Sequence, residues 1–128
     1  MNRWSIPDWL ETEVAQRDRR CVYCGVKFAE QGASRRDQPS WEHIVNDARI
    51  ITPDNIARCC IGCNASKGTK GLAAWLQSKY CRTRGITRES VASVVRSALE
   101  SAAYELAPNK PFHLSSALVP FGRSCRRR

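Results

Sequence analysis

Cys21-Val22-Tyr23-Cys24-Gly25 and Cys60-Ile61-Gly62-Cys63 are the two stretches that decide the fold of this chain. Each holds a C-x-x-C pair, whose two sulfurs can bind one edge of a tetrahedral zinc ion. Gly25 can adopt the positive φ angle that a tight turn around a metal requires. Four cysteine ligands would fill every position around the ion, so we predict a structural Zn²⁺ site that stabilises a small fold.

The other cysteines do not fit this pattern. The chain has seven cysteines, an odd number, and its first residues lack the apolar segment of a secretory signal, so we expect a cytoplasmic protein with metal-bound cysteines rather than a disulfide framework. Cys59 could in principle replace Cys60, but only Cys60 keeps the two-residue gap to Cys63. A redox dithiol would need a βαβ setting, which the sequence does not predict. We therefore predict that Cys59, Cys81 and Cys125 are free thiols.

The charge balance favours a polyanionic partner. Lys and Arg number 21 against 12 Asp and Glu, a formal net charge of +9, which suits the neutralisation of phosphates and the release of their counterions. An anionic membrane surface is the second possibility, but the sequence holds neither an apolar span of about 18 residues nor a strongly amphipathic basic helix. We therefore expect a nucleic acid, and no membrane, as the partner.

Hydrophobic periodicity and helix-end signals predict an α+β fold, with N-caps at Ser5 and Thr87. Segments with helical spacing are predicted as helices: 5–19, a first turn at 64–67, 72–80 and 87–106. Segments rich in aromatic and β-branched residues are predicted as strands: 41–45 and 56–59. The polar stretch 29–39 is predicted as a loop.

At 128 residues the chain has room for one modest core, in which we expect the four tryptophans. We assign residues 1–80 to a zinc-stapled unit whose N-terminal helix packs Trp9, Leu10 and Val14 on that core. Residues 81–128 are assigned to an extension with a helix and a basic tail. The apolar stripe of that helix suits either the monomer core or a dimer surface, so the oligomeric state stays open.

Polar residues accompany the cysteine pairs. The motifs C-V-Y-C-G, W-E-H-I-V, D-N-I-A-R-C-C and I-G-C-N-A-S-K-G, in this order and spacing, resemble the HNH endonuclease family over residues 21–68. The resemblance implies a treble-clef-like ββα-metal core of two strands and a helix, in agreement with the elements predicted above. It also implies a metal-dependent endonuclease that hydrolyses DNA phosphodiester bonds and leaves 5′-phosphate and 3′-hydroxyl ends.

The residue types suit phosphodiester hydrolysis. His43 fits a general base, since an unperturbed imidazole with a pKa of about 6.5 is largely neutral at pH 7. Glu42 and Asn64 offer hard oxygen ligands for a catalytic Mg²⁺ or Mn²⁺. The resemblance implies that Asn55 fixes the strand and loop that carry His43, and we expect Lys67 to meet a phosphate. Adjacent strand residues point to opposite faces, so Glu42 and His43 can meet one phosphate only where the strand twists, bulges or ends.

The expected substrate is double-stranded DNA, held by phosphate contacts that position it without reading its sequence. The candidate contact residues are basic: Arg35, Arg36, Lys67 and Lys70. Two alternatives stay open. A non-catalytic zinc module that binds nucleic acid would use the same cysteines and charge, but it would not need Glu42, His43 and Asn64 together. A nuclease acting on RNA or single strands is the other, although few aromatic residues cluster as a base-stacking surface would require.

Overall fold

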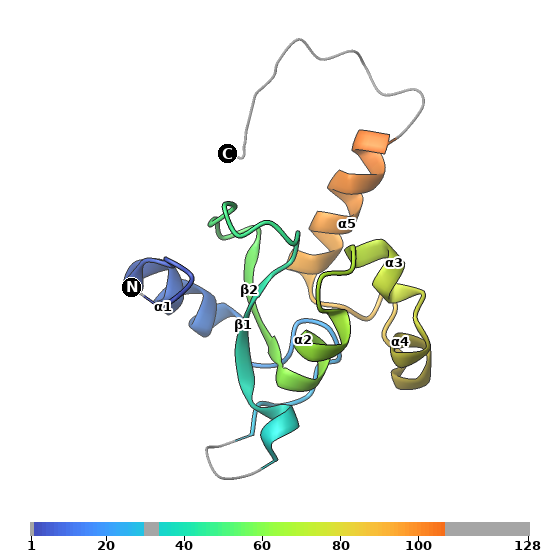
Figure 1. Ribbon diagram of the computed structural model, residues 1–128, viewed down its shortest axis with the longest axis horizontal. Coiled ribbons are helices and arrows are strands. Elements are labelled where there is room, and N and C mark those ends of the chain that lie inside the picture. The colour runs from blue at the N-terminus through green and yellow to red at the C-terminus, as the bar shows by residue number, and fades with distance from the viewer. Residues whose placement is uncertain (1, 30–33, 107–128) are drawn as a thin grey trace.

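The computed structural model describes residues 2–29 and 34–106, with side chains described through residue 102. It shows a small α+β fold in which helices surround a two-stranded antiparallel sheet (Figure 1), so the predicted class is confirmed. In chain order the elements are α1 (Asp8–Arg17), η1 (Arg35–Asp37), β1 (Pro39–His43), β2 (Ile56–Cys60), α2 (Ile61–Lys67), α3 (Leu72–Leu76), α4 (Lys79–Arg84) and α5 (Ser93–Leu106). Cys125 and the predicted basic tail lie outside the described residues.

The sheet leads directly into the helix that carries the second cysteine pair. β1 and β2 pair from Pro39 opposite Cys60 to His43 opposite Ile56. β2 passes into α2 without a loop, and the sulfur of Cys60 accepts a hydrogen bond from the backbone N–H of Cys63, as an N-cap side chain does. The strand end and the first helical turn therefore place two predicted zinc ligands side by side.

The predicted strand 41–45 was wrong in its bounds, because β1 ends at His43. The β-branched Ile44 and Val45 favour a strand, but their backbone binds the far end of the connecting loop instead. Ile44 N–H donates to the carbonyl of Asn55 at 2.9 Å, and Val45 N–H donates to the Asn55 side chain at 2.7 Å. The end of the strand therefore falls at the histidine.

One core joins the first cysteine pair to the helix α5. Val91, Val95 and Leu99 belong to the same buried cluster as Cys21 and Cys63. The backbone N–H of residue 92 also donates to the carbonyl of residue 22 at 2.9 Å. From Val91 to Leu99 the apolar stripe predicted for this helix therefore packs within the monomer.

Helix α5 begins at Ser93 rather than at the predicted Thr87. Thr87 and Ser90 exchange hydrogen bonds between side chain and backbone, from Thr87 N–H to Ser90 Oγ at 2.8 Å and from Ser90 N–H to Thr87 Oγ1 at 3.1 Å. This reciprocal pair is that of a capping box, but the turn it caps, in which Val91 N–H donates to the carbonyl of Thr87 at 3.2 Å, ends before α5 begins.

A second cluster holds α1 against β2. Ile6, Leu10, Val14 and Ile56 are fully buried together. Because the buried stripe runs at spacings of four residues, Trp9 lies off it and is 60% exposed, which corrects its predicted core position.

The predicted cap and one further tryptophan also differ. Ser5 does not cap α1; its φ is 62°, and the N-cap residue is Pro7. Trp4 is 40% exposed, whereas Trp75 is fully buried as predicted. The sequence correctly predicted a helix in this segment, but the helix begins at Asp8.

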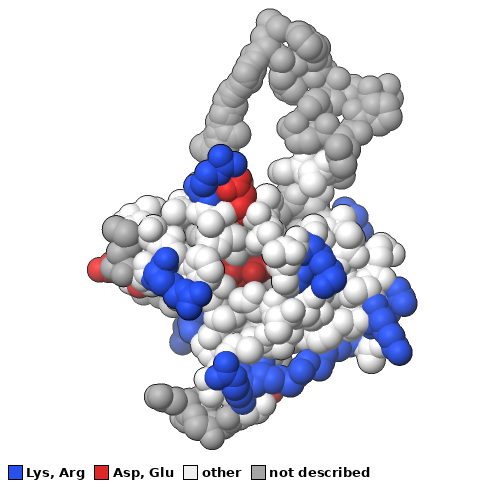
Figure 2. Space-filling model, viewed as in Figure 1, with Lys and Arg blue, Asp and Glu red and all other residues white. Residues whose placement is uncertain are grey.

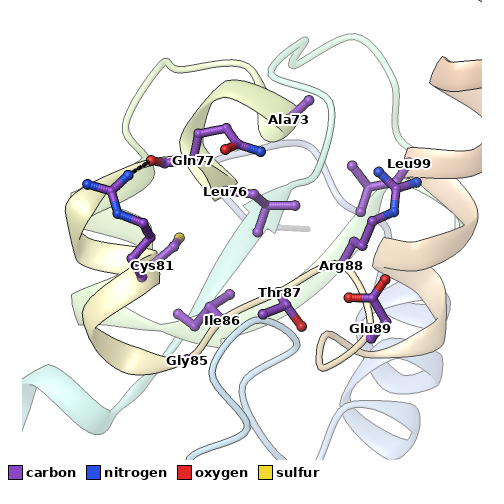
Figure 3. A pocket seen from close by; sticks show the side chains of 11 residues that line it. Ala73, Leu76, Gln77, Cys81, Gly85, Ile86, Thr87, Arg88, Glu89 and Leu99 are labelled. Atoms are coloured by element: carbon purple, nitrogen blue, oxygen red, sulfur yellow. Dashed lines mark hydrogen bonds between the residues drawn. The ribbon is translucent and has the colours of Figure 1, made fainter.

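The predicted helix 72–80 is two short helices, α3 and α4. Ser78 divides them, since its Oγ accepts from the backbone N–H of Cys81 at 3.2 Å and caps α4. α3, α4, the segment before α5 and α5 itself line a pocket of about 420 Å³, into which Leu76, Ile86 and Leu99 project (Figure 3). Among the described residues, no helix has the length and apolar character needed to cross a membrane.

Candidate metal centre and catalytic site

The sulfur atoms of Cys21, Cys24, Cys60 and Cys63 converge, with all four within 4.8 Å of one another. Sγ of Cys24 lies 3.8 Å from Sγ of Cys60. A tetrahedral zinc ion with Zn–S bonds of about 2.3 Å separates its sulfur ligands by about 3.8 Å, so the cluster has the size that zinc requires. The four predicted cysteines are therefore positioned to bind a metal, for which zinc is the natural choice.

The local backbone supports this cluster in the way a zinc knuckle does. The N–H groups of Tyr23 and Cys24 both point at Sγ of Cys21, at 3.4 Å each. Gly25 has the predicted positive φ, 78°. Hydrogen bonds with Cys24, and then with the other two cysteines of the cluster, lower the pKa of Cys21, while hydrogen bonds with Cys21 and Cys24 raise the pKa values of Cys60 and Cys63. Backbone donors and a thiolate acceptor suit a metal ligand.

The remaining described thiols lie apart from the cluster. Cys59 and Cys81 are fully buried and free. Burial raises the pKa of both thiols, and Cys59 contacts the Oγ of Ser40 at 3.7 Å instead of the metal ligands. The two-residue gap therefore selected the correct member of the Cys59–Cys60 pair.

His43 ends β1 in a partly dry setting. Its ring meets the edge of Trp4, with centroids 5.7 Å apart and planes at 72°. Nε2 is buried and has no hydrogen-bond partner in the described part of the chain. Burial lowers the pKa of His43 below its ordinary 6.5, although the charges of Glu42 and Asp47 raise it. The imidazole is thus held neutral near pH 7, as a general base must be.

Glu42, the residue before His43, is 6% exposed and doubly bound through one oxygen. Its Oε2 accepts from the hydroxyl of Tyr23 at 2.5 Å and pairs with Nζ of Lys67 at 3.0 Å. Lys67 was expected to meet a phosphate, but its side chain is only 1% exposed and its charge is directed at Glu42. Burial of the ammonium against a carboxylate explains the difference, because a buried charge needs a partner of opposite sign.

The two asparagines each fix a different part of the site. Nδ2 of Asn64 donates to Ser40 Oγ at 2.9 Å and to the carbonyl of Trp41 at 3.1 Å, which orients its amide from α2 onto β1. Asn55 is 4% exposed and binds the loop after β1 with three bonds: from Val45 N–H, and to the carbonyls of Val45 and Ile50. Asn55 therefore closes the loop beyond His43.

The exposed basic residues lie outside this buried set. Arg35 and Arg36 are exposed in η1, and Arg36 donates to the hydroxyl of Tyr80 at 3.3 Å. Lys70 is exposed as well, with Nζ 3.0 Å from the carbonyl of Ser66. On the face drawn in Figure 2, Lys and Arg side chains lie around a small central area of acidic side chains. This arrangement leaves cationic groups available to a polyanion.

Sequence reasoning missed three residues near His43. Tyr23 donates a hydrogen bond to Glu42, and Trp4 packs on the imidazole of His43. The pKa of Asp47 is lowered to about 2, chiefly by hydrogen bonds from Arg49 and to a smaller extent by the nearby His43. The sequence feature that could have identified Tyr23 is the position of an aromatic residue with a hydroxyl group between two predicted metal ligands. Nothing in the sequence pattern marked the other two.

The pocket of Figure 3 is remote from this chemistry, since none of the predicted site residues lines it. No family model matches the chain, and searches of curated proteins and of solved structures find no match.

Proposed function

We propose that the chain is a metal-dependent endonuclease of the HNH type, which hydrolyses DNA phosphodiester bonds with His43 as the general base. The observation that carries the proposal is a histidine at the end of β1, directly after a buried carboxylate, on a sheet and helix next to a four-cysteine cluster. In this proposal β1, β2 and α2 form the ββα-metal unit. Glu42 and His43 are the last two residues of β1, in regular register opposite Ala57 and Ile56, so the proposal requires the strand to twist at its end for both side chains to reach one phosphate.

The donor set suits a divalent ion. Oε1 of Glu42 and Oδ1 of Asn64 make no hydrogen bond with the residues that the structure describes, while their other polar atoms are bound. Carboxylate and amide oxygens are the ligands that Mg²⁺ and Mn²⁺ prefer. Glu42 and Asn64 would hold such an ion, which when bound stabilises negative charge on the phosphate.

The protein groups divide the reaction between them. His43 takes a proton from a water molecule, whose oxygen then forms a bond to phosphorus. The bond between phosphorus and the 3′ oxygen breaks, and that oxygen gains a proton from solvent, which gives 5′-phosphate and 3′-hydroxyl ends. Asn55 holds the loop beyond His43 so that the imidazole keeps its orientation. Exposed Arg35, Arg36 and Lys70 bind backbone phosphates.

A non-catalytic zinc module that binds nucleic acid is the second candidate. The pairing of Lys67 with Glu42 favours it, since an ammonium already balances the carboxylate that the nuclease would use. The two candidates differ in one testable respect. The module binds DNA without cutting it, and substitution of His43 leaves that binding unchanged.

The test is incubation with supercoiled plasmid, and separately with single-stranded DNA and RNA, in Mg²⁺, Mn²⁺ or EDTA at physiological salt. His43→Ala, shown to keep its zinc and its circular dichroism spectrum, is the matched control. We expect metal-dependent nicking of the plasmid that the variant lacks. DNA binding by both proteins with no cleavage in any metal would support the binding module, and preferential cleavage of RNA or single strands would change the substrate.

A further inference from the structure

A buried tyrosine connects the first cysteine pair to the candidate catalytic carboxylate. Tyr23 lies between Cys21 and Cys24, is 1% exposed, and donates its hydroxyl to Oε2 of Glu42 at 2.5 Å. Its own backbone N–H is directed at Sγ of Cys21 at 3.4 Å. One residue therefore touches both the metal-ligand sulfur and the carboxylate beside His43.

The carboxylate is held from two sides at the same oxygen. Nζ of Lys67 lies 3.0 Å from Oε2, the atom that also accepts from Tyr23. Oε1 accepts no hydrogen bond within the described part of the chain. Two donors on one oxygen prevent rotation of the carboxylate, because rotation would break both interactions. Oε1 is then the carboxylate oxygen left for a ligand.

The tyrosine itself is rigidly placed. Its ring packs edge-to-face on Trp75, with centroids 4.9 Å apart and planes at 71°. Nε1 of Trp75 donates to Oγ of Ser66 at 2.9 Å, and Ser66 is the neighbour of Lys67 in α2. The turn from Cys21 to Cys24, β1 and α2 are thus joined by a closed ring of contacts that passes through the carboxylate of Glu42.

We propose that Tyr23 is a positioning residue, which uses the zinc-binding turn to fix Glu42 so that it binds the catalytic divalent ion through Oε1 alone. The inference rests on the proposed function, because it assigns a role to a ligand of that ion. Residues that orient a metal ligand typically change metal affinity or activity by about 10- to 100-fold when they are substituted. Tyr23→Phe removes only the donor and keeps the ring on Trp75.

The experiment compares wild type with Tyr23→Phe, both loaded with zinc, and titrates each with Mn²⁺ while free Mn²⁺ is followed by electron paramagnetic resonance. Plasmid nicking is measured in parallel as a function of Mg²⁺ concentration. We expect Mn²⁺ affinity to fall by about 10-fold or more, with a matching rise in the Mg²⁺ concentration needed for half-maximal nicking. Zinc content should stay at that of wild type.

Tyr80→Phe is the matched control for Mn²⁺ affinity. It also removes a hydroxyl that points at a cluster sulfur, Cys63 Sγ at 3.4 Å, but the Tyr80 hydroxyl makes no hydrogen bond with Glu42. Its Mn²⁺ affinity should equal that of wild type. If Tyr23→Phe loses zinc, 4-fluorophenylalanine at position 23 replaces it, because fluorine fills the space of the hydroxyl without donating a hydrogen bond.

The outcomes separate the two proposals. Unchanged Mn²⁺ affinity in a zinc-loaded position-23 variant, with a wild type that binds Mn²⁺ and nicks DNA, overturns the role of Tyr23 and leaves the nuclease proposal standing. A wild type that neither binds Mn²⁺ beyond the cysteine cluster nor nicks DNA overturns both. An equal loss of Mn²⁺ affinity in Tyr80→Phe would show a general effect of the zinc cluster and also overturn the role of Tyr23.

Discussion

Replacement of Lys67 by methionine tests the buried ion pair. Lys67 is 1% exposed and lies 3.0 Å from Glu42, which is itself 6% exposed. Methionine keeps much of the buried apolar volume but, among the described residues, leaves the carboxylate with only the Tyr23 hydroxyl as donor. Removing one partner of a buried ion pair costs about 3–5 kcal/mol. Because the Tyr23 bond is kept, we expect the lower end, a loss of about 3 kcal/mol in the free energy of unfolding.

The assay is urea unfolding followed by tryptophan fluorescence at a fixed free Zn²⁺ concentration, since metal loss would couple a second equilibrium to unfolding. Lys70→Met is the matched control: Lys70 is exposed, and its loss should change stability by no more than about 0.5 kcal/mol. Glu42→Gln combined with Lys67→Met should recover part of the loss, because it removes the unpaired charge. A cost for Lys67→Met no larger than that for Lys70→Met would refute the reasoning.

Three further predictions follow from the same contacts. Substitution of Cys63 by serine, or addition of a strong chelator, should unfold the chain, because the binding of structural zinc contributes about 10–16 kcal/mol to the folding of small domains. Circular dichroism would measure this unfolding. Because the pKa of His43 is lowered in the folded protein, its contribution to the free energy of unfolding is present above pH 6.5 and decreases as the pH falls. Trp4→Ala should raise the pKa of His43 toward 6.5 in an NMR titration, because it removes the ring that packs on the imidazole. An unchanged pKa would contradict this packing argument. Arg35→Gln and Arg36→Gln should each make the slope of log K for DNA binding against log salt concentration less steep by about 0.9, as measured by filter binding. Unchanged slopes would exclude these residues from the phosphate-binding surface.

The metal centre could be predicted from the sequence because spacing alone determines it. C-x-x-C fixes two sulfurs on one turn, whatever the rest of the chain does, and the gap from Cys60 to Cys63 excluded Cys59. The α+β class followed in the same way from local periodicity. The ends of elements were less accurate, since contacts between distant residues set them. β1 ends at His43 because Asn55 binds the chain beyond it, which no local pattern records.

The partners of the charged residues in the site could not be predicted from the sequence. Lys67 looked like a phosphate contact because lysine is usually solvated, and only the three-dimensional approach of α2 to β1 shows that it faces Glu42. The exposure of Trp9 had a similar origin: the residue is apolar, but the helix turns it away from the stripe of Leu10 and Val14. Sequence reasoning gives residue types and spacing, whereas pairing across elements requires the fold.

The most direct measurement of the central claim is single-turnover cleavage of a labelled DNA duplex at saturating Mg²⁺, with wild type and zinc-loaded His43→Ala. General-base catalysis typically contributes about 10²- to 10⁴-fold, so we predict a loss of at least about 10²-fold in the variant and partial recovery of its rate with added imidazole. Cleavage by His43→Ala at the rate of wild type would contradict the assignment of His43 as the base.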